Sequence, residues 1–94
     1  MTETIRQRII GLLSEQPMNG RELSKALGIR EREVYDHLAH IARSVGTQGK
    51  RLAIHPFQCL ACGYVFKERA RFTPPGRCPR CKKAHLERPT YSIS

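Results

Sequence analysis

The sequence contains no tryptophan, and aromatic residues make up only 6% of its 94 positions. Apolar residues account for 39% of the chain, so the hydrophobic core must be small. Domains of this size commonly need a second source of stability, such as a disulfide or a metal ion. The composition therefore predicts one small domain, or two very small modules sharing a core, with additional stabilisation.

Long hydrophobic stretches are also missing. The longest apolar run, Ile9 to Leu13, is far too short to cross a bilayer, which takes about 20 residues. The first residues include Glu3, Arg6 and Arg8, and they lack the apolar segment and cleavage site of a secretion signal. We therefore expect a cytoplasmic protein with no membrane segment.

The sequence has no recognisable catalytic constellation. It contains no phosphate-binding glycine loop, no paired carboxylates and no Ser-His-Asp arrangement. No motif indicates a small-molecule substrate either. We therefore do not expect an enzyme.

Acidic residues are scarce. The chain has 8 Asp and Glu against 17 Lys and Arg, a formal net charge of +9. Residues 46–94 hold ten basic and two acidic side chains, whereas residues 1–45 hold seven and six. This distribution predicts an anionic partner for the second half, and nucleic acid before an acidic protein or a membrane surface.

All four cysteines lie in two C-x-x-C motifs that are separated by fifteen residues. Each C-x-x-C turn presents two adjacent corners of a tetrahedron, so two turns complete the coordination of one metal ion. Two disulfides or unpaired buried cysteines are the alternative, but they leave the regular spacing unexplained. The pattern predicts one structural Zn²⁺ with no open position for catalysis. The candidate ligands are Cys59, Cys62, Cys78 and Cys81.

Hydrophobic periodicity predicts three helices in the first half. The first is expected over Thr2–Gln16, with Thr2 as N-cap, and residues 17–20 should form a turn. A second helix should follow Asn19 and end at Gly28. The third is expected over Arg30–Val45. Two short helices joined by a glycine-containing turn predict a helix-turn-helix.

The third helix should bury one face and expose the other. The expected inward residues are Val34, Leu38 and Ile41. The candidate DNA contacts on the outward side are Arg30, Arg32, Tyr35 and Arg43. Glu33 and Asp36 offset part of this positive charge, so a protein-contact face is the alternative.

The second half predicts strands around the cysteines. Residues 52–57 and Thr90–Ile93 are expected to pair as a wing hairpin, with the metal-binding segment in place of the wing tip. Residues 64–72 alternate, which predicts a half-buried strand with Lys67, Arg69 and Arg71 on its outer face. These three are candidate phosphate contacts. A solvated edge that resists aggregation is the alternative.

The chain resembles small, mainly archaeal predicted transcriptional regulators that fuse a winged helix-turn-helix to a rubredoxin-like zinc ribbon. The resemblance covers nearly the whole chain and implies zinc ligation by the four cysteines and a DNA-binding role. It is carried by Arg21-Glu22-Leu23 to Gly28, Glu33-Val34-Tyr35-Asp36-His37-Leu38, Cys59-x-x-Cys62-Gly63-Tyr64-Val65-Phe66 and Cys78-Pro79-x-Cys81.

We accordingly expect an α+β fold, a winged helix-turn-helix of three helices plus wing strands with a zinc ribbon inserted at the wing. The expected division is residues 1–56 for the helices and first wing strand, 57–86 for the ribbon and 87–94 for the returning strand. The expected function is that of a zinc-stabilised, DNA-binding transcriptional regulator. The alternative is a protein- or RNA-interaction module that docks through the ribbon and third helix. A homodimer stays open, although no coiled-coil seam indicates one.

An iron electron carrier is a further alternative, because four-thiolate sites accept iron as well as zinc. Cys62-Gly63-Tyr64 is similar to a rubredoxin knuckle. Lys82, however, stands where such a loop would have glycine, and the helical half would then have no purpose.

Overall fold

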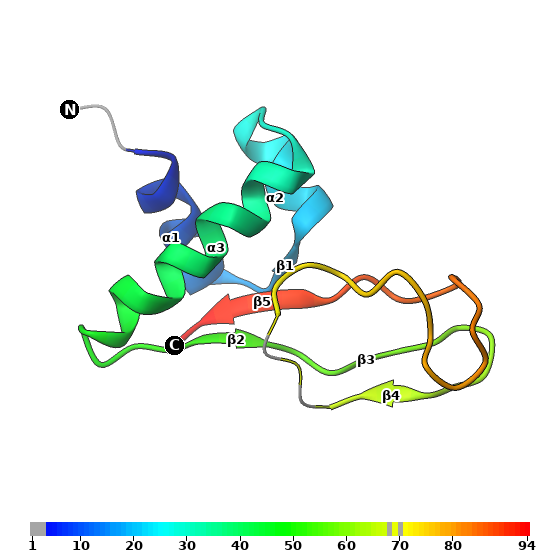
Figure 1. Ribbon diagram of the computed structural model, residues 1–94. Coiled ribbons are helices and arrows are strands. Elements are labelled where there is room, and N and C mark those ends of the chain that lie inside the picture. Colours follow the sequence, from blue (N-terminus) through cyan, green and yellow to red (C-terminus); the bar gives the residue numbers. More distant parts are fainter. Residues whose placement is uncertain (1–3, 68, 70) are drawn as a thin grey trace.

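A computed structural model of the chain describes residues 4–67, 69 and 71–94. Three helices lie on one side of a small sheet, and a ribbon extends beyond the end of that sheet (Figure 1). The molecule is elongated, measuring 48 by 28 by 19 Å. Within the described residues, no helix combines the length and the apolar character needed to span a membrane. The fold is α+β, as the sequence predicts.

Helix α1 (Ile5–Glu15) is capped by Thr4. The Thr4 hydroxyl accepts a hydrogen bond from the Gln7 N–H at 3.1 Å, and the Gln7 side chain accepts one from the Thr4 N–H at 3.0 Å. This capping box pairs two amides that would otherwise lack a helical partner. The prediction of Thr2 as N-cap is wrong, because the box is formed from Thr4; Thr2 itself lies outside the described residues.

Helices α2 (Gly20–Leu27) and α3 (Glu31–Gly46) form the predicted helix-turn-helix. Asn19 and Glu22 make a reciprocal capping pair with bonds of 2.8 and 2.9 Å. Gly28 ends α2 with a φ of 69°, a left-handed conformation that disfavours residues with a Cβ atom. Arg30 precedes α3 without a side-chain cap, and the Glu33 carboxylate accepts the Arg30 N–H at 3.1 Å instead.

Strand β5 (Thr90–Ile93) is the centre of a three-stranded antiparallel sheet with the order β1-β5-β2. Its pairing with β2 (Leu52–Ile54) confirms the predicted wing hairpin for these residues, but the prediction is wrong at Phe57, which pairs with Phe66 in a second sheet. Its other neighbour is β1 (Met18–Asn19). The turn predicted at residues 17–20 is therefore wrong for Met18 and Asn19. These two residues form an extended strand because they pair with β5, which lies at the far end of the chain. This order of helices and strands is that of a winged helix.

The ribbon contains β3 (Phe57–Gln58) and β4 (Val65–Phe66), an antiparallel pair in which the rings of Phe57 and Phe66 stack at 4.5 Å. The strand predicted over residues 64–72 is wrong beyond Phe66 in the described part of that segment. The strand that pairs with β4 is β3, which is only two residues long. It follows Pro56, which has no N–H to extend the ladder. Lys67, Arg69 and Arg71 therefore do not form a row on one strand.

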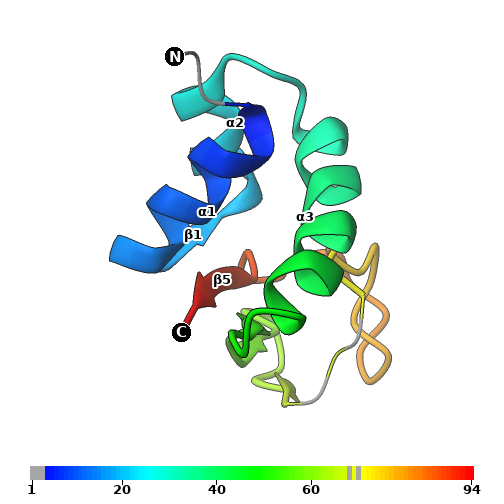
Figure 2. The ribbon, with the colours of Figure 1, turned by 90° about the vertical axis from the view of Figure 1, so that its left-hand side faces the viewer.

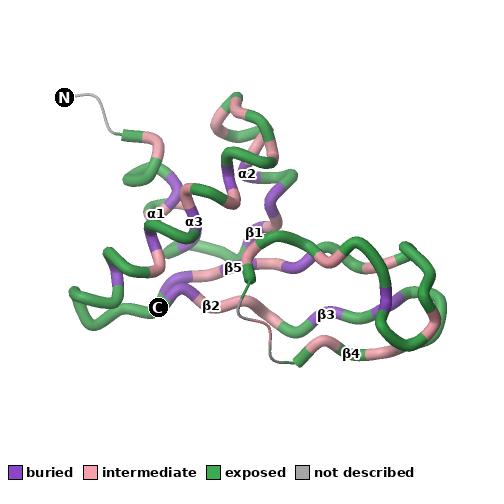
Figure 3. Tube along the Cα trace, in the orientation of Figure 1, coloured by how far each residue is buried: buried purple, intermediate pink, exposed green. Residues whose placement is uncertain are grey.

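The core lies between the helices and the three-stranded sheet (Figure 3). Helices α1 and α3 contact each other, and α1 packs over β5 (Figure 2). Completely buried side chains include the predicted inward residues of α3, namely Val34, Leu38 and Ile41, and the strand residue Tyr91. Within its described residues, the ribbon buries only Phe57, Cys59 and Cys78 among apolar side chains. The ribbon therefore depends on something other than a hydrophobic core.

Candidate metal centre and nucleic-acid interface

The two C-x-x-C turns meet in the ribbon and bring four sulfur atoms together. All four Sγ atoms lie within 4.8 Å of one another. The Sγ atoms of Cys59 and Cys81 are 3.6 Å apart, as are those of Cys62 and Cys78. A tetrahedral zinc ion with Zn–S bonds of about 2.3 Å separates its sulfur ligands by about 3.8 Å. The four predicted ligands therefore fit one zinc ion.

Two equivalent backbone loops hold the cysteines. In the first loop, the Gly63 N–H donates to the Cys59 carbonyl at 2.8 Å; in the second, the Lys82 N–H donates to the Cys78 carbonyl at 2.9 Å. Gly63 and Lys82 both have positive φ angles, 79° and 65°. The Arg80 N–H also donates to the Cys78 sulfur at 3.4 Å, which favours a thiolate.

The surroundings of the cluster shift the pKa values of its thiols in different directions. Burial opposes ionisation of Cys59, but backbone N–H groups and neighbouring thiols outweigh burial and lower its pKa to about 7. The same balance lowers the pKa of Cys78. At Cys62 a bond from the Tyr64 backbone lowers the pKa, but burial and the other thiols prevail and raise it to about 11. A divalent cation bound among the four sulfur atoms favours all four thiolates at once, so that no thiol has to keep its proton.

The positive φ of Lys82 leads to a matched pair of predictions. A residue with Cβ in this conformation costs roughly 1–2 kcal/mol. Lys82→Gly should therefore raise the free energy of unfolding of the zinc-loaded ribbon by about 0.5–1 kcal/mol, once the added chain entropy of glycine is included. Gly63→Ala should lower it by about 1 kcal/mol.

Denaturant unfolding of the zinc-loaded variants measures both effects. Lys83→Gly, at the next position, controls for the lost charge. A stability change of the same sign in Lys82→Gly and Gly63→Ala contradicts the strain argument.

Comparison with known proteins agrees with this fold and site, a winged helix that carries a four-cysteine zinc ribbon. Residues 4–53 match the PF0610-like N-terminal domain, and residues 56–94 match the PF0610 rubredoxin-like zinc β-ribbon domain. The chain therefore belongs to the PF0610-like family. Together with the sulfur geometry, the family match identifies the cluster as the site of one structural zinc ion.

A solved structure is similar to the chain over its whole length. The solution NMR structure of protein PF0610 from Pyrococcus furiosus matches with a TM-score of 0.83 and 31% sequence identity. The match covers 100% of this chain and 94% of that one. No curated protein matches the chain significantly.

The predicted DNA contacts of α3 fall into two groups. Arg30, Arg32 and Arg43 are exposed. Tyr35 is half-buried, and its hydroxyl donates to the Glu31 carboxylate at 2.7 Å. Burial, this bond and the charge of Glu31 raise the Tyr35 pKa well above its usual range. Tyr35 is thus engaged within the protein, and its hydroxyl is not proposed as a phosphate contact.

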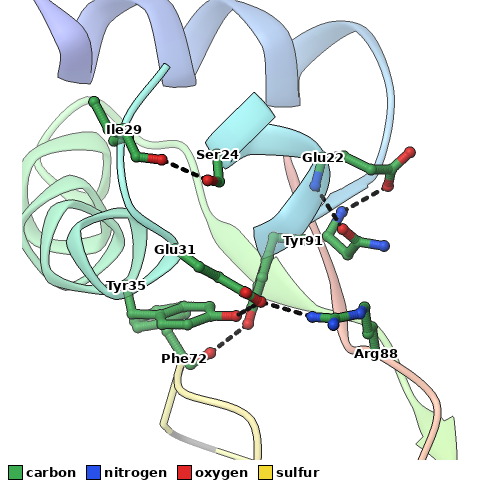
Figure 4. Close-up of polar contacts among 9 residues, drawn as sticks. Glu22, Ser24, Ile29, Glu31, Tyr35, Phe72, Arg88 and Tyr91 are labelled. Carbon is green, nitrogen blue, oxygen red and sulfur yellow. Dashed lines mark hydrogen bonds and ion pairs between the residues drawn. The ribbon is translucent and has the colours of Figure 1, made fainter. Parts of the chain in front are cut away.

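Tyr35 belongs to a polar cluster that joins α3 to the segment leading from the ribbon into β5, and a separate bond joins Tyr91 of β5 to Phe72 (Figure 4). Arg88 Nη1 lies 2.6 Å from Glu31 Oε1, so an ion pair holds the C-terminal segment against the start of α3. The Tyr91 hydroxyl donates to the Phe72 carbonyl and fixes the segment around Phe72 against β5. The ribbon is consequently attached to α3 as well as to the sheet.

Residues 71–73, here called the limb, run beside α3. The limb and α3 enclose a groove of about 450 Å³, here called the helix groove. It is lined by Tyr35, Asp36, Ala39, Ala42 and Arg43 of α3 and by Arg71, Phe72 and Thr73 of the limb. The helix groove brings Arg43 and Arg71 together, whereas Arg30 and Arg32 are not among its lining residues.

Lys67 and Arg69 line a different groove, beside β2. Arg51 lines the same groove and is not among the residues that the sequence predicts as DNA contacts. The sequence feature that could have indicated Arg51 is its position directly before an expected wing strand, where a basic side chain flanks the sheet edge. Sequence alone does not reveal which residues oppose that edge.

Proposed function

We propose that the protein binds double-stranded DNA through α3 and the ribbon, as a transcription regulator or accessory factor. The observation that carries the proposal is the helix groove, which is lined by Arg43 from α3 and Arg71 from the limb. The two halves of the chain therefore contribute to one cationic surface.

The helix groove suits a sugar–phosphate strand. Such a strand is an anionic ridge, and a groove with a cation from each side can bind it through two phosphates. Ala39 and Ala42 have short side chains and leave room between the helix and the limb. Asp36 repels phosphate, so the strand should lie nearer Arg43 and Arg71.

In this proposal the zinc ion supports the binding surface and has no catalytic role. Four thiolates fill a tetrahedral coordination set and leave no position for a substrate or an activated water. The ion holds together the ribbon that leads into the limb. The proposed activity is therefore binding without chemistry.

Substitution of the two arginines tests the helix groove. Arg43→Gln and Arg71→Gln should each weaken binding of the zinc-loaded protein to a short duplex roughly fivefold to tenfold, because each removes a charged hydrogen bond to phosphate. Fluorescence anisotropy at low salt gives the affinities. Arg8→Gln removes the same charge from α1, outside this groove, and should leave the affinity nearly unchanged. Equal losses in all three variants contradict the proposed surface.

A protein- or RNA-docking role is the second candidate, because the ribbon exposes two large apolar side chains. Leu60 in the first knuckle is 53% exposed and Val65 in β4 is 42% exposed. Exposed apolar side chains of this kind can anchor a partner. A stoichiometric partner that is lost in Leu60→Ser, with DNA affinity unchanged, supports docking. If the unmodified protein and the Leu60→Ser variant both bind DNA and neither retains a partner, the docking role is rejected.

A further inference from the structure

The groove beside β2, here called the edge groove, has a volume of about 540 Å³. It is lined by Arg51, Leu52, Ala53, Ile54, Lys67, Arg69 and Phe72. Phe72 also lines the helix groove, so the two grooves are neighbours separated by this part of the chain. A ligand in the helix groove could therefore continue into the edge groove.

Strand β2 lines the edge groove, and among residues 4–67, 69 and 71–94 nothing accepts a hydrogen bond from the N–H groups that it directs there. Arg51 and Ser94 exchange both backbone hydrogen bonds, and the His55 N–H donates to the Thr90 carbonyl. Bonding alternates along an antiparallel ladder, so Arg51, Ala53 and His55 bond towards β5 and the residues that alternate with them direct their N–H groups to the opposite side. Leu52 and Ile54 therefore direct their N–H groups away from β5, towards the free edge of the sheet.

Three cationic side chains meet in the edge groove, namely Arg51, Lys67 and Arg69. Across residues 4–67, 69 and 71–94, the one ion pair joins Arg88 to Glu31. None of the three cations therefore contacts a carboxylate that the structure describes. Cations that converge in a concave site repel one another and raise the local positive potential, which a bound anion would offset.

Arg69 is already held in a defined position. Its Nε and Nη2 atoms donate to the Thr73 carbonyl at 3.2 and 2.7 Å, and the residue is half-buried. Among the described residues, Nη1 has no hydrogen-bond partner and faces no competing acceptor. A guanidinium fixed in this way loses little conformational freedom on binding, and its planar donors match the oxygens of a phosphate.

We propose that the edge groove is a phosphate-binding site formed by Arg51, Lys67 and Arg69 with the amides that β2 directs away from β5. Resting on the proposed DNA-binding function, we assign to it a backbone phosphate of the duplex whose strand lies in the helix groove. The two grooves then hold successive parts of one sugar–phosphate backbone on either side of Phe72. A free phosphate compound has the same chemistry and is distinguished from DNA by the test.

The test titrates zinc-loaded, ¹⁵N-labelled protein with inorganic pyrophosphate and, separately, with a short DNA duplex. Both ligands should shift the amide resonances of Leu52 and Ile54 and the Nε resonance of Arg69. Arg51→Gln and Lys67→Gln should each weaken pyrophosphate binding roughly fivefold to tenfold. Each should also reduce the slope of log affinity for DNA against log salt by about 1. Lys50→Gln, the matched control, removes a charge next to Arg51 but outside the groove lining and should change neither quantity.

The outcomes separate the two proposals. Pyrophosphate binding at the β2 edge without any DNA binding supports the phosphate site and rejects the DNA-binding function. DNA binding with an unchanged salt slope in Arg51→Gln and Lys67→Gln rejects the phosphate site and leaves the DNA-binding function standing. A polyglutamate peptide that displaces pyrophosphate and shifts the same amides more strongly shows a site for an acidic strand, which also rejects the phosphate site.

Discussion

Removal of the zinc ion is expected to unfold the ribbon and leave the three helices folded. The buried apolar residues of the ribbon are few, whereas the helices and the three-stranded sheet share a core of their own. Structural zinc contributes on the order of 10–16 kcal/mol to small zinc-binding peptides at neutral pH. Without it, the ribbon has too little burial to offset the conformational entropy of its chain.

Two-dimensional NMR of the chelated protein measures this directly. Resonances of residues 57–87 should collapse into the random-coil range, and those of α1, α2 and α3 should stay dispersed. The helices should lose on the order of 2 kcal/mol of stability, because β2 and β5 are then joined by a long flexible loop. Re-addition of one equivalent of zinc should restore the spectrum. A ribbon that stays folded without metal contradicts this expectation.

Truncation of Tyr91 is expected to be the most damaging single change in the helical half. The side chain is completely buried in the central strand, its ring lies 6.1 Å from that of Phe72, and its hydroxyl donates to the Phe72 carbonyl. Tyr91→Ala should cost about 3–5 kcal/mol, by analogy with other buried aromatic truncations. This loss is a large part of the roughly 5–15 kcal/mol that stabilises a typical domain.

Thermal unfolding followed by the helical circular dichroism signal measures the loss. The variant should still bind one cobalt or zinc ion, since the four cysteines lie in the ribbon and do not contact Tyr91. A change below about 1 kcal/mol contradicts the central role of this side chain.

The same residue should make the protein sensitive to alkaline pH. Burial raises the pKa of Tyr91 above its usual range, whereas the unfolded chain should titrate near 10. Above pH ~10 the unfolded state releases a proton that the folded state retains, so stability falls as pH rises, by up to about 1.4 kcal/mol per pH unit. Tyr91→Phe should remove this part of the alkaline loss. An unchanged pH profile in that variant contradicts the assignment.

The sequence predicts those features of the fold that depend on local chemistry. Asn19, Glu22 and Gly28 predict the ends of α2 because caps and left-handed glycines act within a few residues of their partners. The periodicity of Val34, Leu38 and Ile41 predicts the buried face of α3, because that face repeats with the helical turn. The two cysteine motifs predict the cluster because each turn fixes two ligands locally.

The features that sequence reasoning missed depend on distant partners. Strand β1 is only two residues long and is extended because Met18 pairs with Tyr91. The strand predicted beyond Phe66 lacks a partner in the two-residue β3, and alternation alone does not reveal a missing partner. Arg51 becomes a candidate phosphate contact only in the folded chain, where Lys67 and Arg69 line the same groove beside β2.

The salt dependence of DNA affinity tests the proposed function most directly. The measurement is fluorescence anisotropy of the zinc-loaded protein with a short labelled duplex between about 50 and 200 mM salt. The two grooves together offer Arg43, Arg71, Arg51, Lys67 and Arg69 as phosphate contacts. Five contacts predict that log affinity falls linearly with log salt, with a slope of about −4.5. The absence of binding to any duplex at the lowest salt, or an affinity that does not change with salt, would contradict the proposed DNA-binding function.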